Sequence, residues 1–191
     1  MSRQLDINHI FWDWHGVLGL NGFWHISSKK DLEIKKFVDY VFTKPAVVDN
    51  WMRSECTIKD LLELSNSRVS YDNLLASFCT DINLAKCNHS LLSAIKALYP
   101  KARHSIITDN MDIFEIHYLN KSKFVGDNFS SVFCSSSAGL LKKDEPGLYE
   151  YTLNRLQLSS FKNTILLDNS QKNCDRFKAL GGLSILIERN K

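Results

Sequence analysis

Acidic and hydroxyl side chains stand at the ends of three short apolar runs. Asp13 ends the run IFWD, Thr108 and Asp109 end SIITD, and Asp168 and Asn169 end TILLDN. Two carboxylates, a backbone carbonyl and waters can hold Mg²⁺, which prefers octahedral oxygen ligands. A carboxylate can also attack phosphorus and form an aspartyl-phosphate. These residue types therefore predict phosphoryl chemistry at a magnesium site, if the three run ends meet in space.

Buried parallel strands are the elements that would bring the run ends together. The apolar runs lie at 7–13, 105–109, 131–134, 164–168 and 183–187. Such continuous runs are typical of strands buried on both faces. Helical patterns lie between the later runs, at 111–121, 146–158 and 171–180. The alternation predicts an α/β fold with a doubly wound, Rossmann-like parallel sheet, which binds ligands beyond the carboxyl ends of its strands.

The stretch between the first two runs has a different character, because its patterns are nearly all helical. Helices are expected at 31–42, 57–64, 70–79 and 88–99. Thr57 and Ser70 are of the residue types that cap helix N-termini. We therefore expect a core domain made of residues 1–21 and 101–191, and a helical cap made of residues 22–100 that covers the strand ends.

Composition limits the possible partners. The 191 residues fit one domain, and 24 Lys and Arg against 21 Asp and Glu give a net charge of +3 with no dense basic cluster. This pattern gives no support for nucleic-acid or membrane binding. The five cysteines include no C-x-x-C pair, and no stretch approaches 18 apolar residues. We expect a cytoplasmic protein, a monomer or homodimer, with a small-molecule partner.

Four segments in order resemble the motifs of the haloacid dehalogenase-like (HAD) hydrolase superfamily. FWDWHGVL resembles hhhDxDG(T/V)L, and SIITDN resembles the second motif, an apolar strand ending in Thr or Ser. GLLKKDEPGLY resembles G-x-x-K-P-D-P-x-I-Y, and ILLDNSQKN followed by ALG resembles hhhDDSxxNxxxAxxxG. The resemblance spans nearly the whole chain. The spacing and the GVL ending most resemble the small helical-cap branch that contains sugar-phosphate phosphatases.

The lysine of the third motif has two candidates. Counting forward from Gly139 selects Lys142, whereas counting back from Pro146 and Tyr149 selects Lys143. The downstream match is longer, so Lys143 is the predicted motif lysine and Lys142 the alternative.

The resemblance implies a role for each motif residue in the metal site. Asp13 would be the nucleophile and a Mg²⁺ ligand, and the backbone carbonyl of His15 a second ligand. Asp168 would be the third protein ligand, with Asn169 bound directly or through water. His15 stands where the family usually has a second Asp, which acts as general acid and base. It is either a substitute for that Asp, since imidazole titrates near neutral pH, or a loop residue without a catalytic role.

The resemblance also implies a phosphate-binding set. Thr108 would donate a hydrogen bond to the phosphoryl oxygens, helped by backbone amides near Asp109 and Asn110. Lys143 would neutralise charge on the nucleophile and the phosphoryl group. Asp144, which stands in place of a family Pro, could divert that lysine into an ion pair.

The function expected from these roles is a Mg²⁺-dependent phosphatase that hydrolyses a small phosphorylated metabolite through an aspartyl-phosphate. A metal-independent carbon–halogen hydrolase, or a catalytically degenerate binding or regulatory protein, remains an alternative, and DWHG makes a phosphonate hydrolase a weaker one. The departures at His15, Asn169 and Asp144 favour the degenerate alternative. Trp14 and Trp24 are expected in the packed interior, or else in an apolar substrate pocket.

Overall fold

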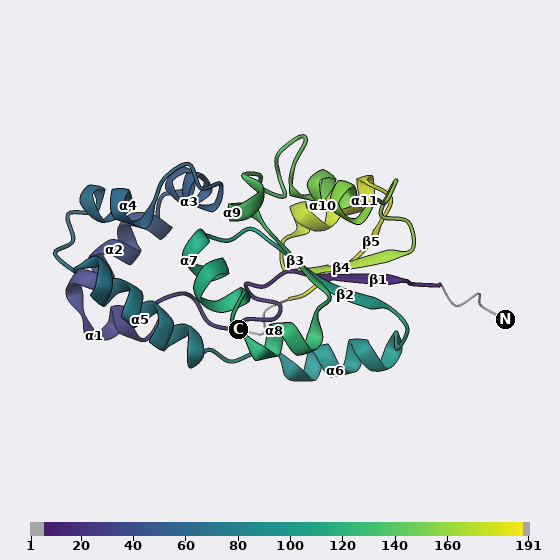
Figure 1. Cartoon of the computed structure of the whole chain (residues 1–191), viewed down its shortest axis with the longest axis horizontal. Helices are drawn as coiled ribbons and strands as arrows, with labels where there is room; N and C mark the ends of the chain where they lie inside the picture. The colour runs from purple at the N-terminus through teal and green to yellow at the C-terminus, as the bar shows by residue number, and fades with distance from the viewer. Residues whose placement is uncertain (1–5, 189–191) are drawn as a thin grey trace.

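The computed structural model describes residues 6–188 and shows a parallel sheet flanked by helices, with a helical cap at one end (Figure 1). The strands are β1 (His9–Trp12), β2 (Arg103–Thr108), β3 (Ser131–Cys134), β4 (Thr164–Asp168) and β5 (Leu183–Leu186). All pairings are parallel, and the order is β3-β2-β1-β4-β5. The predicted doubly wound α/β fold is confirmed, and each of the five apolar runs contains a strand.

The register of the central strands aligns their polar ends. Trp12 of β1 is opposite Ile106 of β2 and Leu167 of β4. The amide of Asp13 donates to the carbonyl of Leu167, 2.9 Å away, so the pairing extends one residue past β1. Asp13 and Asp168 are therefore level on adjacent strands, as the fold predicts for residues at carboxyl ends.

The two faces of the sheet bury separate clusters, because alternate side chains of a strand point to opposite faces. Phe11, Ile107 and Leu166 pack against α10 (Leu148–Leu156) and α11 (Gln171–Ala179). Ile10 and Trp12 point to the opposite face, within a larger cluster that continues into the cap. The central strands β1, β2 and β4 are thus buried on both sides, which explains their uninterrupted apolar runs. The edge strand β5 is largely exposed, so the burial expected for the last run is not found.

The connection from β2 to β3 differs from the single helix predicted over 111–121. It consists of α7 (Asp112–Phe114), the π-helix η1 (Glu115–Leu119) and α8 (Lys123–Asn128). α9 (Ser135–Ala138) follows β3 directly and ends at Gly139, whose φ of +68° is in the left-handed region that favours glycine. The loop after Gly139 returns to the ends of the central strands.

The insertion after β1 contains the expected helices and two short ones that the patterns did not predict. They are α1 (Ser27–Lys30), α2 (Leu32–Phe42), α3 (Pro45–Met52), α4 (Ile58–Leu64), α5 (Tyr71–Asn83) and α6 (His89–Leu98). Thr57 caps α4 through a reciprocal capping box with Asp60, and the Ser70 hydroxyl accepts from the amide of Asn73 in α5. None of the helices within residues 6–188 is both long and apolar enough to cross a membrane.

The chain enters and leaves the cap along two adjacent segments. The amide of Leu20 donates to the carbonyl of Lys86 (3.1 Å), and the amide of Asn88 donates to the carbonyl of Leu18 (2.8 Å). α6 follows this crossing and lies beside α8 under the sheet, away from the other cap helices (Figure 1). The cap boundary at residue 100 stays a prediction, but the last helix of that range lies on the core.

Candidate active site

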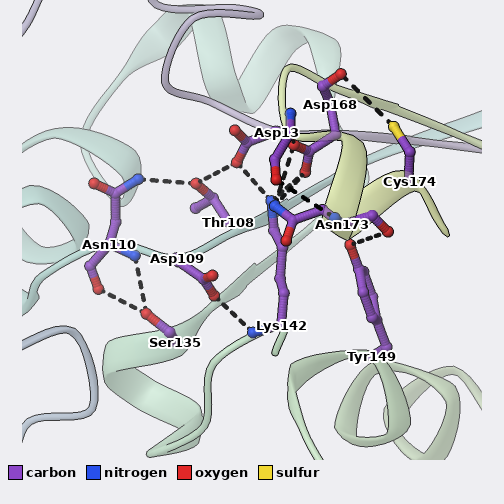
Figure 2. A network of polar contacts seen from close by, with 11 residues as sticks. Asp13, Thr108, Asp109, Asn110, Ser135, Lys142, Tyr149, Asp168, Asn173 and Cys174 are labelled. Atoms are coloured by element: carbon purple, nitrogen blue, oxygen red, sulfur yellow. Dashed lines mark hydrogen bonds and ion pairs between the residues drawn. The ribbon is translucent and has the colours of Figure 1, made fainter. Parts of the chain in front are cut away.

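Side chains from four separate segments converge at the carboxyl ends of β1, β2 and β4 (Figure 2). Asp13 follows β1 directly, Thr108 ends β2 and Asp168 ends β4. Lys142 reaches the same point from the loop after α9. Its Nζ lies 2.7 Å from Asp13 Oδ1 and 2.7 Å from Asp168 Oδ2. One ammonium therefore bridges the two carboxylates.

The preference for Lys143 as the motif lysine was wrong. Lys142 is only 1% exposed and lies between the carboxylates, whereas the Lys143 side chain is 57% exposed and pairs with Asp49 of the cap. Counting forward from Gly139 selects the lysine in the site, so the departure from the motif spacing lies downstream of it. Asp144, expected to divert the lysine, instead pairs with Arg53 through bonds of 2.9 and 2.6 Å.

A shell of donors holds the Asp168 carboxylate. The Nδ2 of Asn173, on the first turn of α11, lies 3.1 Å from both carboxylate oxygens, and the amide of Ser170 donates to Oδ1 at 2.8 Å. Both oxygens of Asp168 are thus oriented before any ligand binds. Asn173 lies within the fourth motif, and no role was predicted for it. Its position five residues after Asp168 is the signal in the sequence that could have predicted this contact.

A short relay of hydrogen bonds orients Thr108 toward Asp13. The Thr108 hydroxyl donates to Asp13 Oδ1 (3.0 Å), and Asn110 Nδ2 donates to the Thr108 oxygen (2.8 Å). The backbone amide of Asn110 donates to Ser135 Oγ (2.9 Å). Ser135, the first residue of α9, thereby fixes the backbone of Asn110 in the loop after β2. The contribution of the backbone amides near Asp109 and Asn110 to phosphate binding stays a prediction.

The Asp109 side chain supports the loop that carries Lys142, and the phosphate contact expected of the backbone amides near Asp109 stays a prediction. Asp109 Oδ1 accepts a 2.9 Å hydrogen bond from the backbone amide of Lys142, so the carboxylate positions the lysine loop. Burial raises the pKa of Asp109 to about 6, against the opposing influence of Lys142.

Electrostatics keeps Lys142 charged. Burial alone would lower its pKa, but the nearby Asp13 and Asp168 carboxylates outweigh that effect and hold the pKa well above its ordinary value. Burial raises the pKa of Asp13, an effect that Lys142 opposes and that Asp168 reinforces. With Asp13 and Asp168 ionised, the three side chains carry a net charge of −1, which leaves the site attractive to a further cation.

The donor set fits Mg²⁺ in its chemistry. Two carboxylates and a neighbouring backbone carbonyl are hard oxygen ligands, and Mg²⁺ commonly binds few protein groups and keeps several waters. Within residues 6–188, no three His, Cys, Asp or Glu side chains are grouped to hold a metal by themselves. A Mg²⁺ ion here would therefore depend on Asp13, Asp168, the His15 carbonyl and water, with Asn169 beside them. These ligand assignments stay predictions.

A cavity of about 360 Å³ adjoins the charged cluster between core and cap. His15, Asp109 and Asn110 line it from the core, and Phe23 is among the residues that line it from the cap. Trp14 and Trp24 are buried in the packed interior, as first expected, and they are not among the residues that line this cavity.

Comparison with known proteins shows similarity in structure but not in sequence. No family profile matches the sequence, and no curated protein is similar to it. A HAD family enzyme from Bacteroides thetaiotaomicron has a TM-score of 0.70 at 19% identity, covering 94% of this chain and 93% of its own. A predicted HAD-like hydrolase from Porphyromonas gingivalis has a TM-score of 0.69 at 15% identity, covering 97% and 93%.

Two further similarities concern ligands and chemistry. The Bacteroides enzyme has also been crystallised with magnesium and inorganic phosphate, in a structure with a TM-score of 0.67 at 18% identity, covering 94% and 93%. An L-2-haloacid dehalogenase has a TM-score of 0.59 at 15% identity, covering 94% and 83%. At these identities the likeness concerns architecture alone. The structural similarity, which extends over more than nine-tenths of the chain, shows that this chain has the fold of the haloacid dehalogenase-like hydrolases.

Proposed function

We propose that this protein is a Mg²⁺-dependent phosphatase that hydrolyses a small phosphorylated metabolite through an aspartyl-phosphate. The observation that carries the proposal is the placement of Asp13. Its Oδ1 accepts from Thr108 Oγ1 at 3.0 Å and from Lys142 Nζ at 2.7 Å, and the same ammonium lies 2.7 Å from Asp168. A carboxylate held in this way presents a fixed nucleophile beside a cation, and positioning with charge stabilisation is what phosphoryl transfer needs from a protein.

The first step forms a bond from Asp13 to phosphorus. We assign the attack to Oδ2, because Thr108 and Lys142 converge on Oδ1. The bond from phosphorus to the substrate's ester oxygen breaks, and the leaving alkoxide takes a proton. Lys142 and the Thr108 hydroxyl stabilise the charge on the phosphoryl oxygens. A bound Mg²⁺ would supply further neutralisation of the phosphate charge.

The second step is hydrolysis of the aspartyl-phosphate by water, which releases phosphate and restores the Asp13 carboxylate. We propose His15 as the group that protonates the leaving alkoxide and then accepts the proton of the attacking water. Its side chain lines the cavity next to the charged cluster, and an imidazole titrates in the neutral range. The pH profile of kcat/KM for His15→Ala tests this role, since an unchanged profile would remove His15 from it.

The experiment for the main proposal is turnover of an aryl phosphate with Mg²⁺ and with a chelator, in the native protein and in Asp13→Asn. We expect turnover that requires Mg²⁺ and is abolished by Asp13→Asn. Asp127→Asn, which changes an exposed carboxylate on α8, is the matched control and should keep full activity. Full activity of Asp13→Asn would overturn the proposal.

A metal-independent carbon–halogen hydrolase is the second candidate. It is favoured by the direct contacts of Lys142 with both carboxylates, which place a cation in the site without a metal. Turnover of a 2-haloacid in chelator would support it. Silence toward 2-haloacids and a broad panel of phosphorylated metabolites would instead support a binding protein.

A further inference from the structure

The wall that the cap contributes to the cavity is entirely apolar within the described part of the chain. Its side chains are Phe23, Val38, Phe42 and Met52, joined by Gly22. They face His15, Asp109 and Asn110, the core residues next to the charged cluster. The volume of about 360 Å³ is within the range of small-ligand pockets, roughly 300–1,000 Å³. A phosphate held at Asp13 would direct its organic group toward this wall.

The charged side chains of the neighbouring cap helices are engaged elsewhere. Lys35 and Asp39 pair with each other along the exposed face of α2. Arg53, next to Met52, is held in its bidentate pair with Asp144, and Asp49 pairs with Lys143. These pairings leave the substrate-facing side of α2 and α3 to carbon and sulfur atoms.

The wall is also rigid at its inner end. The Phe23 ring packs against Phe114 and Phe78, with ring centroids 5.1 and 5.7 Å apart, and lies 6.0 Å from the His15 ring. Phe42 is 37% exposed, so a large apolar side chain meets solvent at the outer end. Hydroxyl groups of a bound ligand would find no side-chain hydrogen-bond partner among the cap residues that line this cavity, and buried polar groups without partners weaken binding.

We propose that the leaving group is apolar, so that the substrates are phosphate monoesters of alkyl or aryl alcohols. This inference rests on the proposed phosphatase function. It differs from the sugar-phosphate class that the motif spacing resembles, because a sugar carries several hydroxyls into the space that the four cap side chains enclose. Each methylene that enters the cavity should improve recognition through burial alone.

The test is a series of straight-chain alkyl phosphates, from ethyl to hexyl, compared with glycerol phosphate and a hexose 6-phosphate. All are esters of aliphatic alcohols, so differences in leaving-group chemistry are small. We expect kcat/KM to rise by up to about fourfold per added methylene and glycerol phosphate to fall below butyl phosphate. A flat series, or a preference for the hexose phosphate, would overturn the inference while leaving a phosphatase.

A variant locates the effect. Val38→Thr keeps the side-chain shape but adds a hydroxyl to the wall, and should reduce the ratio of hexyl to ethyl phosphate turnover severalfold. Val47→Thr makes the same change on α3 at a half-buried position outside the cavity lining, and should leave the ratio unchanged. Equal effects of the two substitutions would contradict the assignment of the wall.

A binding measurement separates this inference from the proposed function. Hexylphosphonate and ethylphosphonate resemble the esters but lack the bond that would be hydrolysed, so titration calorimetry reports recognition without turnover. Tighter binding of hexylphosphonate supports an apolar site even if none of the esters is hydrolysed, a result that would defeat only the phosphatase. Equal affinities would defeat the apolar site even if the esters are hydrolysed.

Discussion

Lys142 and Lys143 are adjacent in the chain but belong to two regions in which charge has different consequences. Lys142 is buried between Asp13 and Asp168 at the strand ends. Lys143 belongs to a core–cap clasp, defined here as the pairs Lys143–Asp49 and Arg53–Asp144, which join the motif loop to α3 and the residue after it. Removing the Lys142 ammonium should lower the unfolding free energy strongly, because it leaves buried carboxylates without a cation. Removing a pair of the clasp should lower it only a little, because water can solvate the charged group that remains.

Lys142→Met should have the largest effect. Met has an unbranched side chain of similar length to that of Lys, but it leaves two buried carboxylates without their cation. Breaking a buried ion pair costs about 3–5 kcal/mol of unfolding free energy. Urea unfolding in the presence of chelator measures the loss, and aryl phosphate turnover should fall about 10²–10³-fold. Lys143→Met is the control, and equal losses in the two variants would erase the contrast between the regions.

His104, a buried side chain at the other end of the sheet, should make the stability of the protein sensitive to acid. His104 Nδ1 accepts a hydrogen bond from Trp12 Nε1 (3.0 Å), and burial, aided by Lys96, lowers its pKa to about 4. Between pH 4 and 6.5 the unfolded histidine binds more protons than the folded one, so its contribution to the unfolding free energy rises with pH and is lost on acidification.

His104→Asn should reduce this dependence, because its amide oxygen can accept from Trp12 but does not titrate. The measurement is the difference in urea midpoint between native and variant protein from pH 4 to 7. Taking the difference removes the opposite contribution of Asp109, whose raised pKa of about 6 favours the folded state at low pH. A difference that does not vary with pH would contradict the assignment.

The Arg53–Asp144 pair should give an intermediate coupling. Its side chains are 20% and 22% exposed, and its two hydrogen bonds hold the pKa of Asp144 below the ordinary value. A double-mutant cycle with Arg53→Ala and Asp144→Ala should return about 1 kcal/mol, because bidentate geometry offsets part of the solvent screening. A coupling as large as that expected for Lys142 would mean that the clasp behaves as a buried site.

Lys143→Ala should have the smallest effect, within about 0.5 kcal/mol, because exposed ion pairs contribute little. The same urea titrations measure it, and added salt should leave the native protein and the variant nearly indistinguishable. A severalfold loss of aryl phosphate turnover in this variant would contradict the assignment of Lys142, rather than Lys143, as the lysine of the phosphate site.

The core was predictable from the sequence because each strand lies in an apolar run, and the three runs that end in Asp13, Thr108–Asp109 and Asp168 meet at one edge of the parallel sheet. Lys142 was misassigned because the third motif departs from the usual spacing, and only the fold shows on which side of the lysine the departure lies. The π-helix at 115–119 and the place of α6 on the core depend on tertiary packing, which a helical pattern does not encode. The cap's apolar wall was invisible for the same reason, since Val38 and Phe42 look like ordinary helix residues.

The paired segments at Leu18–Leu20 and Lys86–Asn88 have a consequence for how such a protein can change. Because the chain leaves and returns at neighbouring points, everything in between is topologically a long surface loop, and its length has only a weak, logarithmic influence on closing it. A different cap can therefore replace this one at the same insertion point without changing the strands of the core. Substrate selectivity, which depends on the cap, can then evolve separately from the chemistry at the strand ends.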